Sequence, residues 1–323
     1  MPKKIRQKTV TRILSDQANA FFKAKYPNDV TRKAFCTNYK KFIRFCRQRY
    51  RCCTAEECRK HINDYVQFLT HETSYTPSTI HSYLAPVCIY FGIGMQKFVK
   101  PRRKTAAYTR GRSGNRRKQR SDNDFANLKY TRLVEFQKCV GLRRSELKRL
   151  TGADFVTDES GAPCVRVKRG KGGKMQLQRI LPCDADFVES YFRGKAADER
   201  IFTPNELKNK LNLHYLRALC AQNACQYYTG RLETEGEPYR QQLMQEITAR
   251  WHLYHRDKRT GKSKPIDKHL LCGTYFLRGD NKKLAQAHGL PTAYDRLALT
   301  AVSVFHLSHW RNDVSAESYL LAV

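Results

Sequence analysis

Acidic residues are scarce in this sequence. The chain of 323 residues has 29 Asp and Glu against 61 Lys and Arg, which gives a formal net charge of +32 at pH 7. Because 41% of the residues are hydrophobic and 11% are aromatic, the charge belongs to a chain that can bury a core and not to a disordered basic tail. So large a positive charge indicates a polyanionic partner, with nucleic acid as the first candidate and an anionic membrane surface as the weaker one.

Long hydrophobic runs are also missing. No apolar stretch approaches the roughly 18 residues that a membrane-spanning helix needs. The charged segment 1–10 is not followed by the apolar region of a secretory signal. We therefore expect a cytoplasmic protein without a membrane partner.

The twelve cysteines show neither a disulfide framework nor a common zinc-binding spacing. Their scatter through segments with helix and strand patterns favours reduced thiols that pack as small hydrophobic groups. We expect no cofactor and no bound metal. A zinc site is the weaker alternative, and its candidate ligands are Cys220, Cys225, His252, His255, His269 and Cys272.

The length allows two domains, and composition suggests where they divide. Residues 1–99 have the periodicity of four short helices, with helix starts marked at Thr54 and Thr76. Residues 100–121 form a basic linker, because the stretch 100–120 has ten basic residues and no acidic one. Residues 122–323 form the second domain.

Basic residues on the first domain and the linker are expected to contact DNA phosphates. The first fifty residues alone have 14 Lys and Arg against 2 Asp and Glu. A solvated loop that binds nothing is the weaker alternative for the linker, because each phosphate that the linker neutralised would release counterions and so add affinity. The predicted DNA-binding residues are Lys40, Lys41, Arg44, Arg102, Arg103, Arg116, Arg117 and Lys174.

The second domain alternates helix and hairpin signals. Strands are expected at 164–168 and 175–181, joined by a turn at 169–174. Helices are expected around 128–150, 184–192, 212–228, 238–255, 291–305 and 314–321. The predicted fold class is mainly α with a small β-hairpin, an α+β arrangement.

Five short motifs follow one another in the second domain. The first is the segment 141–150, in which Arg143 and Glu146 share one helical face. The second is the glycine-rich turn around Lys171, and the third pairs His214 with Arg217 at helical spacing. His309 and Tyr319 close the series near the end of the chain.

Together these motifs resemble the ordered active-site boxes of the tyrosine recombinases, the phage-integrase family. The resemblance implies that Arg143 and Arg217 clamp the DNA phosphate and that Lys171 is the general acid. It implies that His214 assists proton removal, that His309 contacts the phosphate, and that Tyr319 is the nucleophile. Glu146 corresponds to the acidic partner of the first arginine, and Lys174 is the alternative to Lys171.

The sequence departs from the family in two places. The second arginine is followed by Ala218, where the family commonly has a histidine. Arg217 and His309 lie 92 positions apart, where most relatives have a few tens. We infer an insertion at about 227–290, which could bind DNA, contact another protomer or be merely tolerated.

The resemblance also implies an architecture and an activity. Residues 1–99 would form a helical, SAM-like core-binding domain, and residues 122–323 a catalytic domain. The function expected is site-specific DNA recombination through a 3′-phosphotyrosine, which integrates or excises a mobile element at attachment sites in double-stranded DNA. A homo-tetramer on DNA and a directionality factor would be its protein partners.

Two alternatives remain open. A type IB topoisomerase-like or telomere-resolving enzyme would share the phosphotyrosine chemistry but not the paired specific sites. A non-catalytic DNA-binding accessory, a decayed integrase, would occupy a site without cutting it.

Overall fold

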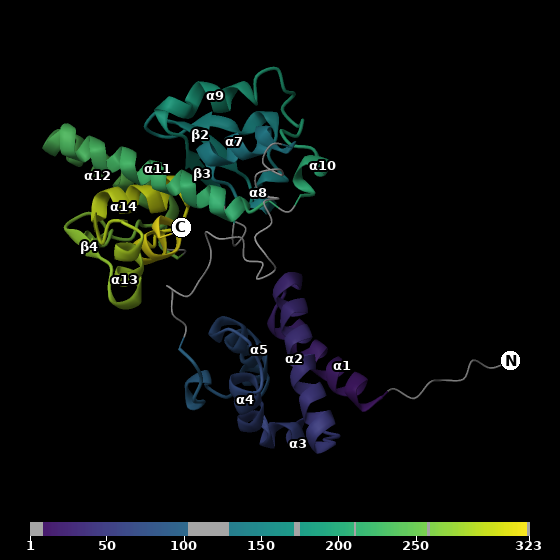
Figure 1. Ribbon diagram of the computed structural model, residues 1–323. Helices are drawn as coiled ribbons and strands as arrows, with labels where there is room; N and C mark the ends of the chain where they lie inside the picture. The colour runs from purple at the N-terminus through teal and green to yellow at the C-terminus, as the bar shows by residue number, and fades with distance from the viewer. Residues whose placement is uncertain (1–8, 103–128, 171–174, 210, 257–258, 322–323) are drawn as a thin grey trace. The chain divides into compact units, whose positions relative to one another are not determined.

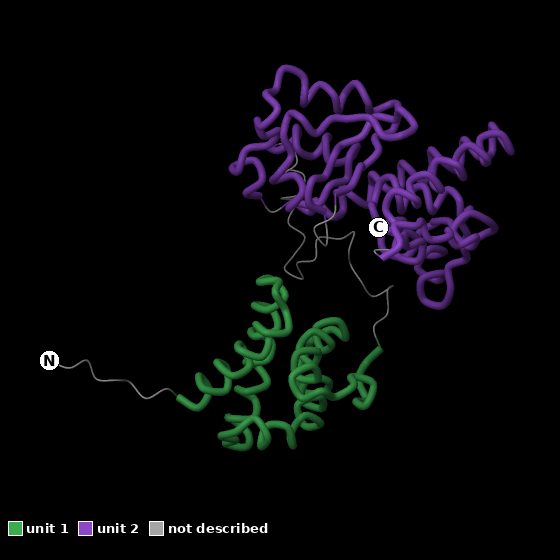
Figure 2. Tube along the Cα trace, turned by 180° about the vertical axis from the view of Figure 1, so that it is seen from behind, with its two compact units in different colours: residues 1–103 green, residues 104–323 purple. Residues whose placement is uncertain are grey.

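The computed structural model describes residues 9–102, 129–170, 175–209, 211–256 and 259–321. The chain divides into two compact units, unit 1 (residues 1–103) and unit 2 (residues 104–323), which are coloured separately in Figure 2. Helices dominate both, and the described strands form two small antiparallel sheets in unit 2 (Figure 1). The predicted class, mainly α with a small β component, is confirmed. In the described parts of the chain, no helix is both long and apolar enough to cross a bilayer.

In its described residues, 9–102, unit 1 has five α-helices, so the prediction of four is wrong. They are α1 (Val10–Lys25), α2 (Asp29–Tyr50), α3 (Ala55–Lys60), α4 (Ile62–His71) and α5 (Pro77–Tyr90), followed by the 3-10 turn η1 (Met95–Lys97). The extra helix arises because the backbone of His61 leaves helical geometry between α3 and α4. Both predicted helix starts are confirmed: Thr54 and Glu57 form a capping box, and Thr76 caps α5 ahead of Pro77.

The core of unit 1 is aromatic. Phe22, Tyr39 and Phe42 are fully buried where α2 packs against α1, α4 and α5. Of the basic residues predicted on α2, Lys40 and Arg44 are exposed. Lys41 is half-buried, with its ammonium nitrogen 3.6 Å from the centre of the Tyr83 ring, so cation–π attraction already engages part of its charge.

The first half of unit 2 is built around a three-stranded sheet. Its elements are α7 (Thr131–Val140), α8 (Arg144–Leu147), η3 (Gly152–Asp154), β1 (Phe155–Thr157), β2 (Pro163–Val167), β3 (Gln176–Arg179), η5 (Pro182–Asp184), α9 (Ala185–Ser190) and α10 (Pro204–Leu207). The strand order is β1-β2-β3, with Val165 opposite Gln178. The predicted hairpin is therefore confirmed as β2 and β3, whereas the short strand β1 was not predicted.

The second half of unit 2 is mostly helical. Its elements are α11 (Leu213–Thr234), α12 (Gly236–Tyr254), η6 (Lys268–Leu270), β4 (Thr274–Phe276), α13 (Gly279–Ala287), β5 (Ala293–Asp295), α14 (Arg296–Ala301), η7 (Val302–His306), α15 (Asn312–Ser315) and η8 (Ala316–Leu320). The helix expected at 291–305 begins late, because Ala293–Asp295 pairs with β4 as a strand. The turns η7 and η8 are π-helical, a geometry that often marks functional sites.

Helix α11 connects two hydrophobic cores. Leu213 and Leu216 pack with α7, the sheet and α9, whereas Ala218, Ala221 and the residues beyond pack with α12, α14 and the C-terminal turns. Figure 1 shows α11 running between these two parts of unit 2. Arg217 therefore lies where the cores meet, in a position that water reaches poorly.

Candidate active site

The loop between α7 and α8 places Arg143 and Glu146. Gly141 ends α7 with a φ of 64°, and a Cβ there would lie 3.0 Å from the Cys220 sulfur, so glycine permits both the turn and the close approach of α11. The Arg143 amide donates to one Glu146 carboxylate oxygen and its guanidinium to the other, both at 2.7 Å. The Glu146 side chain is almost fully buried, and it therefore fixes the arginine at the start of α8.

Arg217, on α11, is 1% exposed. Its guanidinium donates to the carbonyl oxygen of Gly141 and, at 2.7 Å, to that of Leu307. Its Nε has no hydrogen-bond partner among the described residues. Burial lowers the pKa of Arg217, while the neighbouring Tyr319 acts in the opposite direction.

His309 follows a backbone position that resembles a glycine site. Ser308 has a φ of 52°, a left-handed conformation that residues other than glycine rarely adopt. The His309 amide donates to the Ser303 carbonyl at 2.8 Å, which fixes the segment after η7.

His309 is half-buried, but both nitrogens of its imidazole are buried and available for hydrogen bonding. Neither ring nitrogen has a partner within the described ranges of the chain. Burial first, and then the charge of Arg217, lower its pKa to about 4, so the ring is neutral near pH 7. A neutral imidazole offers one N–H donor, which an anion would satisfy.

Tyr319 lies in η8, 5% exposed, between the groups described above. Its ring centre is 5.2 Å from that of His214 and 6.0 Å from that of His309. The guanidinium carbon of Arg217 is 5.8 Å from the same ring centre. Gln222 of α11 donates to the Tyr319 carbonyl at 3.4 Å and holds the turn on the helix. His214 is exposed at the beginning of α11 and makes further contacts of its own.

The structure thus brings five of the six predicted catalytic residues together, along with Glu146. The sixth, Lys171, lies outside the described residues, as do Lys174, Arg103, Arg116 and Arg117. Arg102 is described and exposed at the end of unit 1. The site places the Tyr319 phenol beside Arg217 and two histidines, and Arg143 lies close enough to lower the pKa of both Arg217 and His309.

The zinc alternative does not assemble. In the described portion of the chain, no three His, Cys, Asp or Glu residues are grouped so that they could hold a metal ion. His255 is instead stacked on Trp251 with ring centres 3.7 Å apart, and the Cys220 thiol contacts the Cys139 carbonyl. These side chains make packing contacts and do not point to a common metal position.

Strand β3 supports the site through residues that the sequence analysis did not identify. Gln176 donates to the Ser308 carbonyl at 3.4 Å, and Gln178 donates to the Gly141 carbonyl at 3.1 Å. Residues two apart on a strand face the same side, so this face contacts both segments that place the site. Polar residues at alternate positions of a predicted strand were the available signal.

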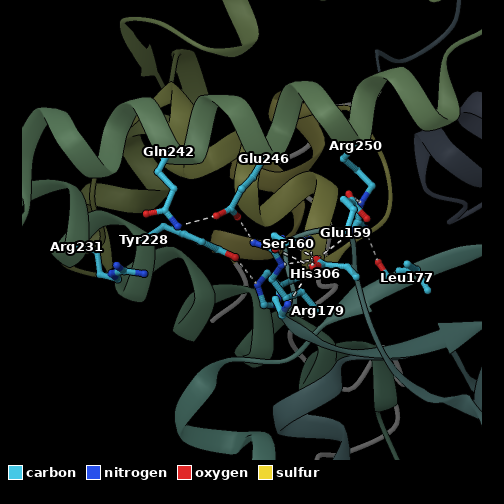
Figure 3. Close-up of polar contacts among 12 residues, drawn as sticks. Glu159, Ser160, Leu177, Arg179, Tyr228, Arg231, Gln242, Glu246, Arg250 and His306 are labelled. Atoms are coloured by element: carbon cyan, nitrogen blue, oxygen red, sulfur yellow. Dashed lines mark hydrogen bonds and ion pairs between the residues drawn. The ribbon is translucent and has the colours of Figure 1, made fainter.

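The opposite side of β3 meets a second buried polar cluster, which the sequence analysis also missed (Figure 3). Arg179 of β3 and Arg250 of α12 both bind Asp158, at 2.6 and 2.8 Å, and the Asp158 side chain is fully buried. Arg179 also pairs with Glu246, and Arg250 with Glu159, both at 2.6 Å. Burial alone would raise the pKa of Asp158, but Arg179 and hydrogen bonds from Ser160 lower it.

This cluster also attaches α12 to the strand backbone. Arg250 donates to the Leu177 carbonyl at 3.0 Å, and its guanidinium carbon lies 5.2 Å from the centre of the Phe305 ring. Helix α12 is therefore anchored to β3 by an arginine whose charge is neutralised and whose donors are satisfied.

Comparison with known proteins gives little. No family model matches the chain, and no curated protein matches it. Among solved structures, the crystal structure of XerA recombinase matches with a TM-score of 0.22 and 14% identity, over 67% of this chain and 85% of that one.

Proposed function

We propose that this protein is a site-specific DNA recombinase that cleaves and rejoins DNA through a 3′-phosphotyrosine at Tyr319. The observation that carries the proposal is a tyrosine next to buried cationic and hydrogen-bonding groups that lack an anion. Arg217 has a free Nε, and His309 has two free ring nitrogens, among the described residues. A phosphodiester would supply the charge and the acceptor oxygens that these groups lack.

The proposed chemistry is one phosphoryl transfer. His214 takes the phenolic proton, the Tyr319 oxygen attacks phosphorus, and the bond from phosphorus to the 5′ oxygen breaks. Arg143, Arg217 and His309 bind the non-bridging oxygens as charge builds on them. Lys171 gives a proton to the leaving 5′ oxygen, with Lys174 as the alternative donor.

Rejoining is the reverse step on a different strand. A 5′ hydroxyl attacks the phosphotyrosine, the phenol leaves, and Tyr319 is restored. One phosphoester replaces another, so no external energy source is needed. Exchange between two duplexes requires several active sites, and we propose a homo-tetramer on paired attachment sites of a mobile element.

The DNA duplex would be held by both units. We propose unit 1 as the core-binding domain, with Lys40 and Arg44 exposed for phosphates, and Lys41 sharing its charge with Tyr83. Residues 100–121, including Arg102, Arg103, Arg116 and Arg117, would form the basic linker to a catalytic domain at 122–323. A directionality factor would be an additional partner.

Covalent trapping tests the chemistry. Nicked suicide duplexes made from the DNA that flanks the gene are incubated with the protein, denatured and separated on a gel. We expect a denaturant-resistant adduct with the wild type and none with Tyr319→Phe. Tyr275→Phe is the matched control, because it also removes one phenol hydroxyl, which in the half-buried Tyr275 donates to Glu317 at 3.1 Å.

Each other outcome has a defined meaning. An adduct that persists in Tyr319→Phe would place the nucleophile on another tyrosine. Sequence-specific binding without an adduct would indicate the non-catalytic accessory. Relaxation of any supercoiled plasmid, without sequence preference, would favour the topoisomerase-like enzyme.

A further inference from the structure

The segment that separates Arg217 from His309 includes a strongly basic loop. We define the basic loop as residues 255–270, which follow α12 and end with η6. It has six Lys and Arg against two Asp. Arg256, Lys262, Lys264 and Lys268 are exposed.

The first end of the basic loop is closed on itself and fixed to α12. The Lys264 amide donates to the His255 carbonyl at 2.9 Å, and the Trp251 indole donates to the Lys264 carbonyl at 2.7 Å. The His252 imidazole contacts the Ser263 hydroxyl. The backbones of Arg256 and Ser263 pair with each other in an isolated antiparallel β-bridge. These contacts fix the backbone of Lys262 and Lys264 to the end of α12.

The second end is fixed to α14 and α15. Arg296 donates to the His269 carbonyl at 3.1 Å. The hydroxyl of Thr300 contacts the Leu270 carbonyl at 2.5 Å and accepts from the Asn312 amide group at 2.7 Å. Asn312 comes three residues after His309, so the same contacts fix both the loop and the segment beyond the candidate active site.

An aromatic contact brings the loop base next to that site. The ring of Trp310, the residue after His309, packs edge-on against Trp251 and His255, each with ring centres 4.9 Å apart. A chain of direct contacts thus runs from the Lys264 backbone through Trp251 to Trp310.

The lysines in the described part of the loop are not paired with a carboxylate of the same chain. No ion pair joins Lys262, Lys264 or Lys268 to a carboxylate in the described part of the chain. The nearby Asp267 carboxylate accepts instead from the His269 amide, at 2.9 Å. Exposed cations elsewhere in unit 2 are often paired, as Lys195 is with Glu199.

We propose that the basic loop is a phosphate-binding surface for duplex DNA, formed by Lys262, Lys264 and Lys268 with Arg256. This inference rests on the proposed function, because it takes DNA as the partner. Since both ends of the loop are fixed, binding orders little additional chain, and unpaired lysines gain by releasing counterions from the duplex. The inserted segment would extend the contact with DNA beyond the phosphate that Tyr319 attacks.

Salt-dependent binding tests this proposal. Binding of a short random-sequence duplex is measured by fluorescence anisotropy between about 50 and 200 mM salt. The loop variant is Lys262→Gln, Lys264→Gln, Lys268→Gln, and the control variant is Arg193→Gln, Lys195→Gln, Lys208→Gln. The control removes the same charge from exposed positions near α9 and α10, away from α13 and α14 in Figure 1.

We expect the loop variant to reduce the slope of log affinity against log salt by about 2–3, at roughly 0.9 for each lost phosphate contact. The control should keep the wild-type slope. Equal slopes in the loop variant and the wild type, or equal losses in both variants, would overturn the proposal.

The trapping experiment separates this inference from the proposed function. If the wild type forms an adduct and the loop variant keeps the wild-type salt slope, the DNA-binding role of the loop is rejected and the proposed chemistry stays supported. A reduced loop slope without an adduct supports the DNA surface and rejects the chemistry. A wild type that does not bind duplex DNA rejects both.

Discussion

Among its described residues, unit 2 buries arginine side chains in two places, and the two places differ in how the charge is balanced. Arg179 and Arg250 share the Asp158 carboxylate and have further carboxylates in Glu246 and Glu159. Arg217 is as deeply buried, but its guanidinium donates to two backbone carbonyl oxygens.

The difference separates a structural role from a functional one. A buried charge without a counter-charge is costly, and a protein keeps one where a ligand will balance it. Glu146 is the nearby carboxylate, but it is already paired with Arg143. The candidate site therefore has two arginines for one carboxylate, whereas Arg179 and Arg250 have three carboxylates between them.

The largest effect is expected from Arg217→Met, measured as the rate of adduct formation on a suicide duplex. Loss of one preorganised charged donor should slow the reaction by about 10³-fold, because charge on the phosphate in the transition state is no longer balanced. Stability should change little, since methionine fills similar space without a desolvated charge.

Urea denaturation of Arg217→Met provides the control. A free energy of unfolding close to that of the wild type, together with the loss of rate, supports the functional assignment. Destabilisation as large as the loss in activity would instead place Arg217 with the structural arginines.

Arg250→Met should reduce stability strongly and the rate of adduct formation only slightly, the opposite of Arg217→Met. Removing one partner from the Asp158 cluster leaves Glu159 unpaired and Asp158 with Arg179 alone. We expect a loss of about 3 kcal/mol in the free energy of unfolding, at the lower end for a broken buried ion pair because Arg179 remains. Urea denaturation measures it.

The control for Arg250→Met is its rate of adduct formation. At a temperature where Arg250→Met is fully folded, adduct formation should stay within about tenfold of the wild type, since Arg250 does not contact the candidate site. A loss as large as that of Arg217→Met, in a folded protein, would mean that the two clusters are not separate.

The hairpin, two helix caps and the pairing of several candidate site residues could be predicted from the sequence, because each depends on a local pattern. The hairpin of β2 and β3 follows from two runs in which apolar and polar residues mostly alternate, joined by a glycine-rich turn, and the caps at Thr54 and Thr76 follow from short-range spacing. His214 and Arg217 lie one helical turn apart, and Arg143 and Glu146 bond across three positions. Each of these depends on neighbours within a few residues.

The balance of charge at each arginine depends on distant neighbours, and no local pattern contains it. Asp158 and Arg250 are 92 positions apart, and Arg217 meets Leu307 from 90 positions away. A sequence shows Arg179, Arg217 and Arg250 as equivalent basic residues. The left-handed backbone of Ser308 was likewise hidden, since serine carries no sign of it.

A smaller effect is expected at two histidines, the buried His306 and the half-buried His309, whose ring nitrogens are also buried. Burial, with help from Arg217, lowers the pKa of His309 to about 4, and burial with Arg179 lowers that of His306 to about 3. Both folded values lie below the ordinary value of 6.5. Between the folded value and 6.5, the unfolded chain therefore binds more protons than the folded chain does. Each histidine therefore lowers stability as the pH drops from about 6.5 towards its folded pKa.

An anion should distinguish the two histidines. His306 already bonds to the Tyr228 hydroxyl at 3.1 Å, whereas both nitrogens of His309 lack partners among the described residues. Sulfate bound beside Arg217 would cancel its charge and accept a hydrogen bond, so we expect the pKa of His309 to rise by about one unit, roughly 1.4 kcal/mol. NMR titration of the imidazole carbons, with and without sulfate, follows both rings at once.

The shift should disappear in Arg217→Met, because the anion loses its cationic partner there. Sulfate does not titrate in this pH range, so any change in the pKa of His309 reports binding and not the protonation of the probe. If sulfate moved both histidines equally, the anion would be acting through the net charge of +32 and not through a site. Selective movement of His309 would show that the charge imbalance around Arg217 is local, which is what distinguishes a binding site from a structural cluster.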